Sequence, residues 1–439
     1  MKKTKIICTM GPNTDNKEVM RELAVHGMDI ARFNFSHGDH EEQKKRLKIL
    51  KAVRDELGLS IAALLDTKGP EIRTGILKDG KKVLLKEGER FILTTREIEG
   101  DEKQVSITYK GLVQDIQAGN RVLIDDGLIE LEVEEKNETD IVCIIKNGGE
   151  LGSKKGVNIP NVKVNLPAIT EKDREDIIFG VEQGFDFIAA SFVRNADCIR
   201  EIKAVLHEHN ADIPVIAKIE NAEGIENIDE IIHVSDGIMV ARGDMGVEIP
   251  AQDVPFIQKM IIKKCNDTYK PVITATQMLD SMMRNPRPTR AEVTDVANAI
   301  YDGSDAVMLS GETSIGRYPV ETLKMMVQIA ESTEEHLDYD RFRDHTKMHR
   351  KKNISSAVSF SSVATAENLN AAVIITPTMS GSTARLVSKF RPKAIQVGIS
   401  PNKAVLRKMQ LYWGVKPLRS MPEETTDCLL YTSFSLVNF

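Results

Sequence analysis

The sequence has few cysteines, few aromatic residues and no long apolar run. Its 439 residues include five cysteines and one tryptophan, and aromatic residues make up 5% of the chain. The cysteines form no Cys-x-x-Cys pair, which argues against a disulfide framework or a cysteine metal site and fits the reduced thiols of the cytoplasm. No run approaches the roughly 20 apolar residues of a membrane span, and the apolar stretch after the N-terminal lysines is too short for a signal peptide. We therefore expect a cytoplasmic protein without a membrane partner.

The chain also lacks a strong excess of charge of either sign. Its formal net charge is -6, with 28% charged and 41% hydrophobic residues. This balance gives no footprint for nucleic acid, although a locally positive site for an anionic substrate stays compatible with it. The length and the apolar content are sufficient for the cores of two or three domains.

The most informative stretch, residues 215–250, predicts a strand, a helix, a second strand and a turn. The first strand ends in Lys218-Ile219-Glu220, so Lys218 and Glu220 point to one face. The second strand ends in Arg242-Gly243-Asp244. If the strands are parallel neighbours, a lysine, two carboxylates and a glycine turn meet at one edge, where the carboxylates suit Mg²⁺. For Lys218 and Glu220 alone, a structural ion pair at a barrel rim is the simpler interpretation.

Strand and helix patterns alternate in two blocks of the chain. Apolar runs, each followed by a helical pattern, predict strands at 5–9, 29–35 and 61–66, and again at 185–192, 214–219, 237–241, 272–276 and 306–310. Eight such units are the number that closes an α/β TIM (β/α)8 barrel with its site at the C-terminal strand ends. We predict this barrel over residues 1–69 and 168–340.

Two further segments follow other patterns. Residues 70–167 show short alternating runs with turn signals such as Asp125-Asp126-Gly127, which predict an inserted small β-barrel domain placed over the barrel mouth as a lid. Residues 341–439 begin in a polar, basic linker (DHTKMHRKKN) and predict a C-terminal α/β domain that is truncated, with a tail (CLLYTSFSLVNF) that fits no element. The turn at residues 378–383 is either a phosphate cradle at a helix start or an ordinary Ser/Thr N-cap.

Polar residues end five of the predicted barrel strands. A buried unpaired charge is costly, so stability alone does not explain them. Arg32, on the second strand, offers a rigid fork for phosphate or carboxylate. Its neighbours on the second and third strands present oxygens with one negative charge, which suits a monovalent cation or, equally, a hydrogen-bond network. These neighbours are Asn34, Ser36, Asp66 and Thr67.

Seven sequence motifs from these segments are informative in combination. They are ARFNFSHG (31–38), LDTKGPEIRTG (65–75), KGVNIP (155–160), AKIENAEG, MVARGDMGVEIP, TATQMLDSM (274–282) and AEVTDVANAIYDGSDAVMLSGETSIGRYP (291–319). Over residues 3–418 the chain thereby resembles pyruvate kinase, with Met245 and Asp280 as mild departures. The resemblance implies a phosphotransferase that moves phosphate from phosphoenolpyruvate to ADP, giving pyruvate and ATP in the last step of glycolysis.

The resemblance also implies roles for the strand-end residues. Lys218, Thr276 and Arg32 would be catalytic, with Lys218 stabilising the phosphoryl group in transfer. The substrate would be bound by Arg32, Gly243, Asp244 and Thr276. Mg²⁺ would be held by Glu220 and Asp244, and K⁺ by Asn34, Ser36, Asp66 and Thr67. The nucleotide would meet Asn34, Phe35, Ser36, His37, Arg73 and Lys155.

Further implications concern cofactors and partners. Family members that depend on K⁺ carry glutamate at the position of Glu71, so we expect K⁺ dependence. The C-terminal domain would bind a sugar-phosphate or similar effector and would support a homotetramer, if it folds. Two other functions fit part of the sequence. A Mg²⁺–enolate barrel such as a pyruvate aldolase would not need Arg73, Lys155 or a lid, and an inactive fragment would follow if the shortened C-terminal domain prevents folding.

Overall fold

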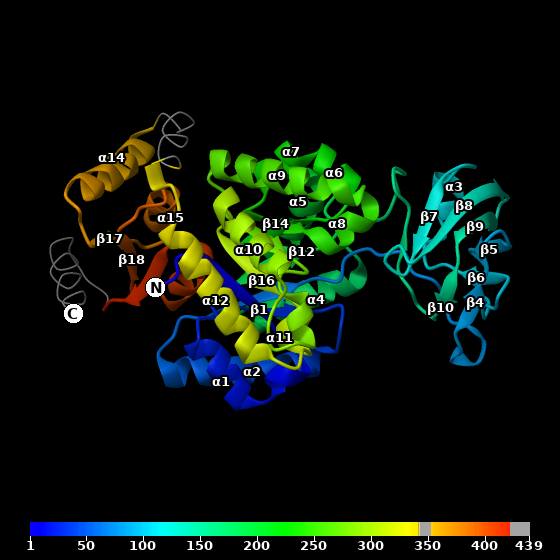
Figure 1. Cartoon of the computed structure of the whole chain (residues 1–439), viewed down its shortest axis with the longest axis horizontal. Coiled ribbons are helices and arrows are strands. Elements are labelled where there is room, and N and C mark those ends of the chain that lie inside the picture. Colours follow the sequence, from blue (N-terminus) through cyan, green and yellow to red (C-terminus); the bar gives the residue numbers. More distant parts are fainter. Residues whose placement is uncertain (341, 343–352, 422–439) are drawn as a thin grey trace.

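The computed structural model describes residues 1–340, 342 and 353–421, and its centre is a barrel of eight parallel strands (Figure 1). These strands are β1 (Lys5–Thr9), β2 (Ile30–Asn34), β3 (Ala62–Asp66), β12 (Phe187–Ala190), β13 (Val215–Ile219), β14 (Gly237–Ala241), β15 (Val272–Ala275) and β16 (Ala306–Leu309). The barrel closes in the order β1-β16-β15-β14-β13-β12-β3-β2. Each strand lies within its predicted run, so the predicted TIM barrel is confirmed.

Helices cover the outside of this barrel. They are α1 (Lys17–Val25), α2 (His40–Leu57), α4 (Glu171–Gln183), α5 (Ala196–Glu208), α6 (Ala222–Glu226), α7 (Ile228–Val234), α8 (Arg242–Glu248), α9 (Val254–Thr268), α10 (Arg290–Asp302), α11 (Gly311–Ser314) and α12 (Pro319–Glu335), with 3-10 turns η1 (Pro12–Asp15), η3 (Ala251–Asp253) and η4 (Asp280–Met283). Local sequence sets their ends. Helix α2 begins after Asp39, whose side chain caps Glu42 N–H, and ends at Gly58 in a left-handed conformation.

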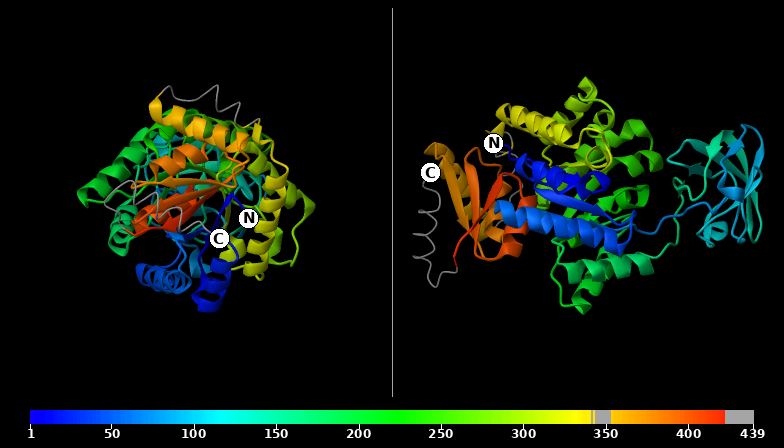
Figure 2. Two further views of the ribbon diagram at one scale, coloured as in Figure 1. Left: turned by 90° about the vertical axis from the view of Figure 1, so that its left-hand side faces the viewer. Right: turned by 90° about the horizontal axis from the view of Figure 1, so that it is seen from below.

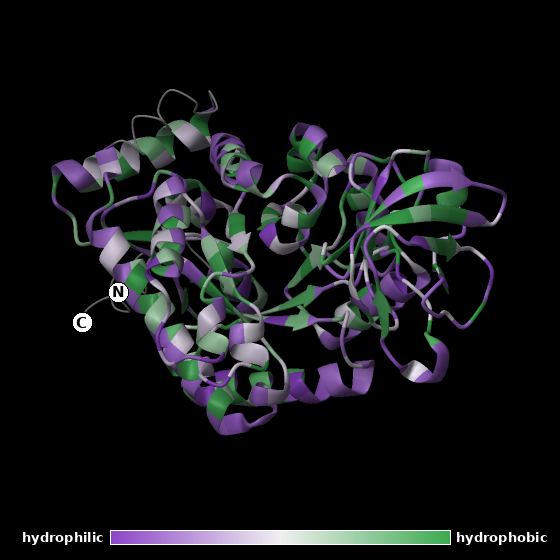
Figure 3. Ribbon diagram, turned by 45° about the vertical axis from the view of Figure 1, so that its right-hand side comes forward, coloured by the Kyte–Doolittle hydropathy of each residue, from purple (hydrophilic) through white to green (hydrophobic). Residues whose placement is uncertain are grey.

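The barrel strands are apolar along their whole length because both of their faces are buried. In β1, Ile6 and Cys8 pack outward against the helices, whereas Ile7 packs inside the barrel with Ile30 and Ile216. Figure 3 shows the strands largely in hydrophobic colours and the outer helices with many hydrophilic residues. The polar residues at the strand ends are therefore exceptions to an otherwise apolar pattern.

The lid lies between β3 and α4 in the chain. It contains β4 (Val83–Leu85), β5 (Arg90–Thr94), β6 (Gln104–Ser106), β7 (Arg121–Ile124), β8 (Ile129–Lys136), β9 (Asp140–Asn147), β10 (Gly149–Leu151), β11 (Val157–Asn158), η2 (Lys78–Gly80) and α3 (Leu112–Asp115). Six strands form one sheet in the order β11-β7-β8-β9-β5-β6, and β10 pairs with β4. The predicted turn at Asp125-Asp126-Gly127 is confirmed, since it joins the antiparallel strands β7 and β8 with positive φ at all three residues.

The C-terminal domain has a parallel three-stranded sheet. Its elements are α14 (Ile354–Asn368), β17 (Val373–Pro377), α15 (Ser382–Ser388), β18 (Ile395–Ser400), α16 (Lys403–Lys408), η5 (Met409–Leu411) and β19 (Val415–Arg419). The sequence predicts no strand at β19, which follows Gly414 in a left-handed turn and pairs with β18. The interior of the predicted linker and the tail from residue 422, with Cys428, lie outside the described residues.

The lid and the C-terminal domain lie at opposite ends of the barrel (Figures 1 and 2). Hydrogen bonds tie the C-terminal domain to the N-terminal end of the strands, among them Lys5 Nζ to Val415 O at 2.6 Å, Arg391 Nη2 to Gly303 O at 2.5 Å, and Arg407 Nε to Asp186 Oδ1 at 2.6 Å. This leaves the C-terminal strand ends facing the lid. In the part of the chain that the structure describes, no helix combines the length and the apolar character needed to cross a membrane.

A buried cation lies between the barrel and the C-terminal domain. Lys389 Nζ has no hydrogen-bond partner among the described residues and lies over the ring of Tyr269. Burial lowers the pKa of Lys389 to about 7, and the charge of Asp267 offsets this only in part. Folding therefore shifts this lysine toward its neutral form relative to the unfolded chain.

We expect Lys389→Met to raise the apparent melting temperature by about 2–4 °C at pH 6, because it removes the cost of a buried ammonium. In the unfolded chain the lysine has a pKa of about 10.4, so this cost decreases as the pH rises above 7 and the gain should be smaller at pH 9. Thermal melts at both pH values measure the effect. A variant that melts below the wild type at pH 6 would contradict the expectation.

Candidate active site

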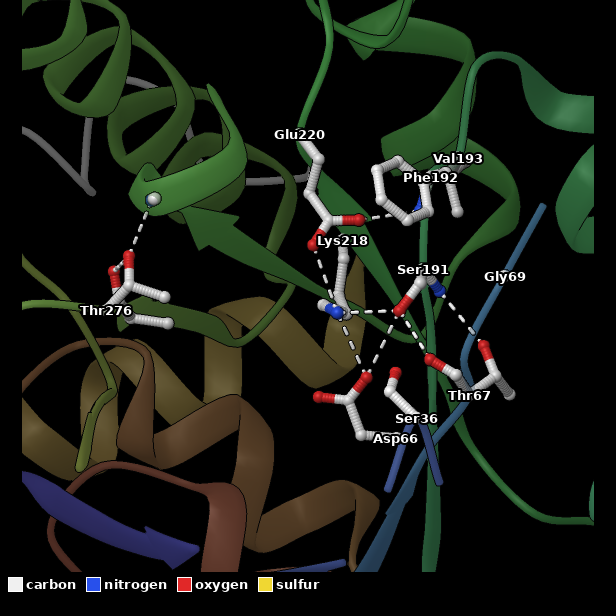
Figure 4. Close-up of polar contacts among 12 residues, drawn as sticks. Ser36, Asp66, Thr67, Gly69, Ser191, Phe192, Val193, Lys218, Glu220 and Thr276 are labelled. Carbon is white, nitrogen blue, oxygen red and sulfur yellow. Dashed lines mark hydrogen bonds and ion pairs between the residues drawn. The ribbon is translucent and has the colours of Figure 1, made fainter. Parts of the chain in front are cut away.

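Three strands bring charged side chains to one point at the C-terminal end of the barrel, where Figure 4 shows Asp66, Lys218 and Glu220 together. Arg32 Nε on β2 donates to Asp66 Oδ2 on β3 at 2.5 Å. Lys218 Nζ on β13 lies 3.0 Å from Asp66 Oδ1 and 3.0 Å from Glu220 Oε1. All four side chains are buried. The predicted pairing of Lys218 with Glu220 on one face is therefore confirmed, and the structural ion pair considered as its alternative is also present.

Neighbouring charges in this cluster determine the protonation states of Asp66 and Lys218. Burial by itself would raise the pKa of Asp66, but Arg32 and Lys218 hold the pKa below its ordinary value. Burial would likewise lower the pKa of Lys218, but Asp66 and Glu220 raise it above its ordinary value. Lys218 is therefore an ammonium and Asp66 a carboxylate at neutral pH. A buried, fixed positive charge of this kind stabilises negative charge in a transition state.

Glu220 and Asp244 are the two carboxylates predicted to hold Mg²⁺, and the charge of Asp244 acts on Glu220. Burial raises the pKa of Glu220 to about 7; Lys218 lowers it only in part, and the charge of Asp244 raises it further. Two carboxylates that repel each other, one buried and one half-buried, fit a divalent cation. Among the described residues, no group of three or more His, Cys, Asp and Glu side chains is arranged to hold a metal. A pair of carboxylates suits Mg²⁺, which commonly takes one or two of them and completes its shell with water and substrate oxygens.

Asp244 lies in the first turn of α8, which begins at Arg242 directly after β14. The predicted glycine turn at this position is thus wrong, because the chain enters a helix at once. Gly243 N–H donates to Thr276 Oγ1 at 2.7 Å, which joins the ends of β14 and β15. A side chain at residue 243 would still have ordinary contacts with Thr276, so the glycine is not required there by space.

Thr276 follows β15 instead of ending it. Its φ of 71° is left-handed, so the strand stops at Ala275, one residue before the predicted end. Arg242 holds this turn, since its guanidinium donates to Thr276 O at 2.8 Å and to Asp295 Oδ1 at 2.7 Å. The role of Arg242 is absent from the sequence prediction, although its charge at a strand end is the signal that singled out Arg32.

The predicted monovalent-cation ligands lie at the ends of β2 and β3. Asn34 Oδ1 accepts from Ser36 N–H at 3.1 Å, and Phe35 N–H donates to Asp66 O at 2.9 Å. Thr67 Oγ1 accepts from Ser191 N–H at 3.1 Å. The hydrogen-bond network considered from spacing is therefore present. Its one carboxylate, already facing two cationic side chains, fits a monovalent ion better than a divalent one.

A cavity of about 380 Å³ separates the lid from the barrel mouth. It brings Arg73 and Lys155 from the lid opposite Asp244 from the barrel. Lys155 Nζ donates to Asp125 Oδ1 at 2.9 Å, and Arg73 Nη1 donates to Lys154 O at 2.8 Å. Both predicted nucleotide-binding cations thus face the mouth across this space.

The other predicted nucleotide-binding residues lie outside the lining of this cavity. The ring of Phe35 is buried between Phe179 and Phe185, so only its backbone is available to a ligand. His37 is exposed. The predicted nucleotide-binding residues therefore form two groups. Arg73 and Lys155 belong to the lid, whereas residues 34–37 lie at the end of β2 on the barrel.

The structure adds residues that the sequence missed. Asp126 lines the cavity, and burial together with the charges of Asp244 and Asp125 raises its pKa. Asn158 Nδ2 on the lid donates to Glu248 Oε1 on α8 at 2.8 Å. Arg194 donates to backbone oxygens at 164, 166 and 167, where the chain returns from the lid. Local sequence patterns could not predict these contacts, because each contact joins segments that are distant in the sequence.

Comparison with known proteins gives concordant matches along the chain. The family profile described as "Pyruvate kinase, barrel domain" matches residues 1–323, and "Pyruvate kinase, alpha/beta domain" matches residues 356–437, further than the predicted end of the resemblance at 418. A pyruvate kinase of Geobacillus stearothermophilus is 52% identical over 98% of this chain and 73% of its own length. One of Clostridium acetobutylicum is 52% identical over 99% of this chain and 92% of its own length.

A solved structure agrees with these matches. The crystal structure of a pyruvate kinase from Cryptosporidium parvum superimposes with a TM-score of 0.96 and 41% sequence identity. The match covers 99% of this chain and 90% of that one. The order of barrel, inserted lid and C-terminal α/β domain is therefore shared over nearly the whole length.

Proposed function

This chain belongs to the pyruvate kinase family, a family of phosphotransferases, and we propose that its barrel mouth transfers phosphate from phosphoenolpyruvate to ADP. The products are pyruvate and ATP. The observation that carries this proposal is the buried ammonium of Lys218, held at 3.0 Å from both Asp66 and Glu220 at the barrel mouth, where Asp244 borders the cavity that Arg73 and Lys155 line from the lid. Cations at the barrel mouth and on the lid suit two phosphorylated substrates.

The roles of the mouth residues follow from their charge and position. We propose that Arg32 and Lys218 are catalytic and neutralise the phosphoryl group in transfer, since both are buried cations at the same carboxylate. Gly243, Asp244 and Thr276 bind and orient the substrate carboxylate, and Thr276 lies beside the carbon that is protonated. The lid keeps water from the reacting atoms, which strengthens each of these electrostatic interactions.

Members of the family use metal ions, and the donor sets described above fit two of them. We propose that Glu220 and Asp244 hold Mg²⁺, and that K⁺ is held by Asn34, Ser36, Asp66 and Thr67. Mg²⁺ supplies Lewis-acid stabilisation of negative charge on a substrate oxygen when it is bound. Glu71 accepts a hydrogen bond from Arg73 Nε at 2.5 Å, so the side chain that implies K⁺ dependence also orients a cation proposed for the nucleotide.

A coupled assay with the purified full chain tests the function. Pyruvate formation from phosphoenolpyruvate, followed as NADH loss through lactate dehydrogenase, should require ADP, Mg²⁺ and K⁺ together. Replacement of K⁺ by a large organic cation should lower the rate, as should chelation of Mg²⁺. Pyruvate released from a hydroxy-oxo acid, with none formed from phosphoenolpyruvate and ADP, would favour the aldolase-like alternative. A folded protein without any turnover would favour the inactive fragment.

Lys155 provides a test of the nucleotide side. We expect Lys155→Met to raise the KM for ADP about tenfold, with kcat and the KM for phosphoenolpyruvate changed less than about threefold, because one half-buried cation on the lid contributes to binding more than to the transition state. Steady-state kinetics with each substrate varied in turn gives these values. As a control, Lys163→Met removes another cation of the cavity lining that no role is assigned to. An unchanged KM for ADP in Lys155→Met would contradict the assignment.

The effector, the homotetramer and the cytoplasmic location stay predictions. The turn at residues 378–383 leads into α15, whose N-cap residue is Gly381. No side chain caps this helix, so the interpretation of the turn as an ordinary Ser/Thr N-cap is wrong. Thr378 Oγ1 instead accepts from Gly381 N–H at 2.9 Å, inside the turn. A phosphate cradle for a sugar-phosphate effector is the interpretation that stays open to test, and sedimentation of the full chain would measure its oligomeric mass.

A further inference from the structure

The sequence predicts no functional residue at the end of β12, yet the turn after this strand lies at the centre of the site. Lys218 Nζ donates to Ser191 Oγ at 2.6 Å, and Phe192 N–H donates to Glu220 Oε2 at 2.6 Å (Figure 4). Two successive residues therefore contact the ammonium and the carboxylate that carry the proposed function. We call Ser191 and Phe192 the β12 turn.

The hydroxyl of Ser191 has a defined direction. It carries one hydrogen, and its oxygen accepts from Lys218, so the hydrogen is left for one acceptor. Thr67 O lies at 2.6 Å and Asp66 Oδ1 at 3.2 Å, which favours donation to Thr67. Ser191 N–H also donates to Thr67 Oγ1. Ser191 thus joins the end of β3 to the Lys218 ammonium through two short hydrogen bonds in sequence.

The backbone of the β12 turn is held in an uncommon conformation. Phe192 has a φ of 55°, in the left-handed region that a bulky residue rarely adopts. The turn packs directly on Gly69, where the chain leaves the barrel for the lid: a Cβ at Gly69 would lie 2.9 Å from both Ser191 Cβ and Phe192 Cδ2. Strained residues persist where their surroundings fix them, and they concentrate at functional sites. The close approach to Gly69 is what fixes this turn.

We propose that the β12 turn positions the phosphoryl-transfer groups, with Ser191 aiming the Lys218 ammonium and Phe192 N–H holding the Glu220 carboxylate. The inference rests on the proposed function of the site. A lysine side chain has four flexible carbons, and Asp66 and Glu220 alone would let its nitrogen move between them. Ser191 adds a third, neutral acceptor that defines one position without competing for the charge. A phosphoryl oxygen can then share one of the N–H hydrogens while the other contacts keep the nitrogen in place.

The main test is Ser191→Ala in the full chain. We expect kcat to fall on the order of 10- to 100-fold, with the KM for phosphoenolpyruvate changed by less than about twofold, as for loss of a hydrogen bond to a charged group that matters in the transition state. The matched control is Ser304→Ala. Ser304 is also buried and bonds Thr274 Oγ1 at 2.7 Å, but it precedes β16 at the opposite end of the barrel. Its kcat should stay within about twofold of the wild type.

A double-mutant cycle distinguishes positioning from a structural role. If Ser191 acts through Lys218, then Ser191→Ala should lower the residual kcat of Lys218→Met by less than about twofold, so the two effects are not additive. An equal loss in both backgrounds, or an effect confined to KM, overturns the proposal. If Ser191→Ala does not melt cooperatively, Ser191→Cys takes its place, because sulfur keeps the volume and accepts hydrogen bonds only weakly.

Turnover by the wild type distinguishes a failure of the positioning role from a failure of the proposed function. Wild-type turnover with unchanged kcat in a folded Ser191→Ala or Ser191→Cys protein overturns the positioning role alone. A wild type that forms no pyruvate from phosphoenolpyruvate and ADP overturns the proposed function together with it.

Discussion

Lys218→Met is expected to lower kcat for pyruvate formation by about 10³-fold or more, the range seen when a cation that stabilises a phosphoryl transition state is removed. The structural reason is that the Lys218 ammonium pairs with both Asp66 and Glu220. Without it, Arg32 alone faces Asp66, and the remaining charge at the mouth repels a phosphate. The coupled assay at high enzyme concentration measures the residual rate.

Lys389→Met is the matched control for this variant, because it makes the same substitution at a lysine whose Nζ is buried on the far side of the barrel. It should keep kcat within about twofold of the wild type. Circular dichroism and thermal melts of both variants show whether the barrel is intact. A folded Lys218→Met protein with kcat within about tenfold of the wild type would exclude a catalytic role for this ammonium.

Glu220→Gln is expected to lower kcat by about 10²- to 10³-fold and to raise the Mg²⁺ concentration needed for half-maximal rate, since it keeps the shape of the side chain and removes one of two carboxylates. The wild type should also show a pH dependence of this Mg²⁺ requirement. The pKa of Glu220 is raised to about 7, chiefly by burial, so below this pH a proton occupies the carboxylate and competes with the cation.

The direction of this pH dependence follows from the raised pKa of Glu220. In the wild type, the half-saturating Mg²⁺ concentration should rise as the pH falls from 8 to 6 and should be nearly constant above 8, where Glu220 is ionised. Glu220→Gln should lack this component of the pH dependence. Glu334→Gln is the control, because Glu334 is buried and accepts from Lys3 and Thr4 N–H at the other end of the barrel. A Mg²⁺ requirement in Glu220→Gln equal to that of the wild type would contradict the assignment.

The strand ends of the site were predictable because they depend on local pattern. Both faces of a barrel strand are buried, so each strand is a short apolar run, and the first polar residues after it mark its C-terminal end. Lys218, Glu220 and Asp66 were found in this way. The alternation of side chains also placed Lys218 and Glu220 on one face before any coordinates were considered.

Other parts of the site depend on contacts between distant segments. The left-handed backbone at Phe192 and Thr276 is not required by residue type and follows from packing against Gly69 and from the hydrogen bonds of Arg242. The lid turn with Asp126 was predicted as a turn, but its position opposite Asp244 depends on how the lid folds back over the mouth. The local sequence pattern does not show which distant segments of the chain will lie close together.

The sequence by itself determined the barrel, the inserted lid, the C-terminal α/β domain, and the identity of the charged residues that end the strands. Only the tertiary structure decided how those charges are divided: Asp66 between Arg32 and Lys218, Lys218 among Asp66, Glu220 and Ser191, and Glu220 between Lys218 and Phe192 N–H. The physical reason is that periodicity fixes which way a side chain points along its own strand, whereas its partners and its pKa depend on burial and on charges that other strands bring within hydrogen-bond distance.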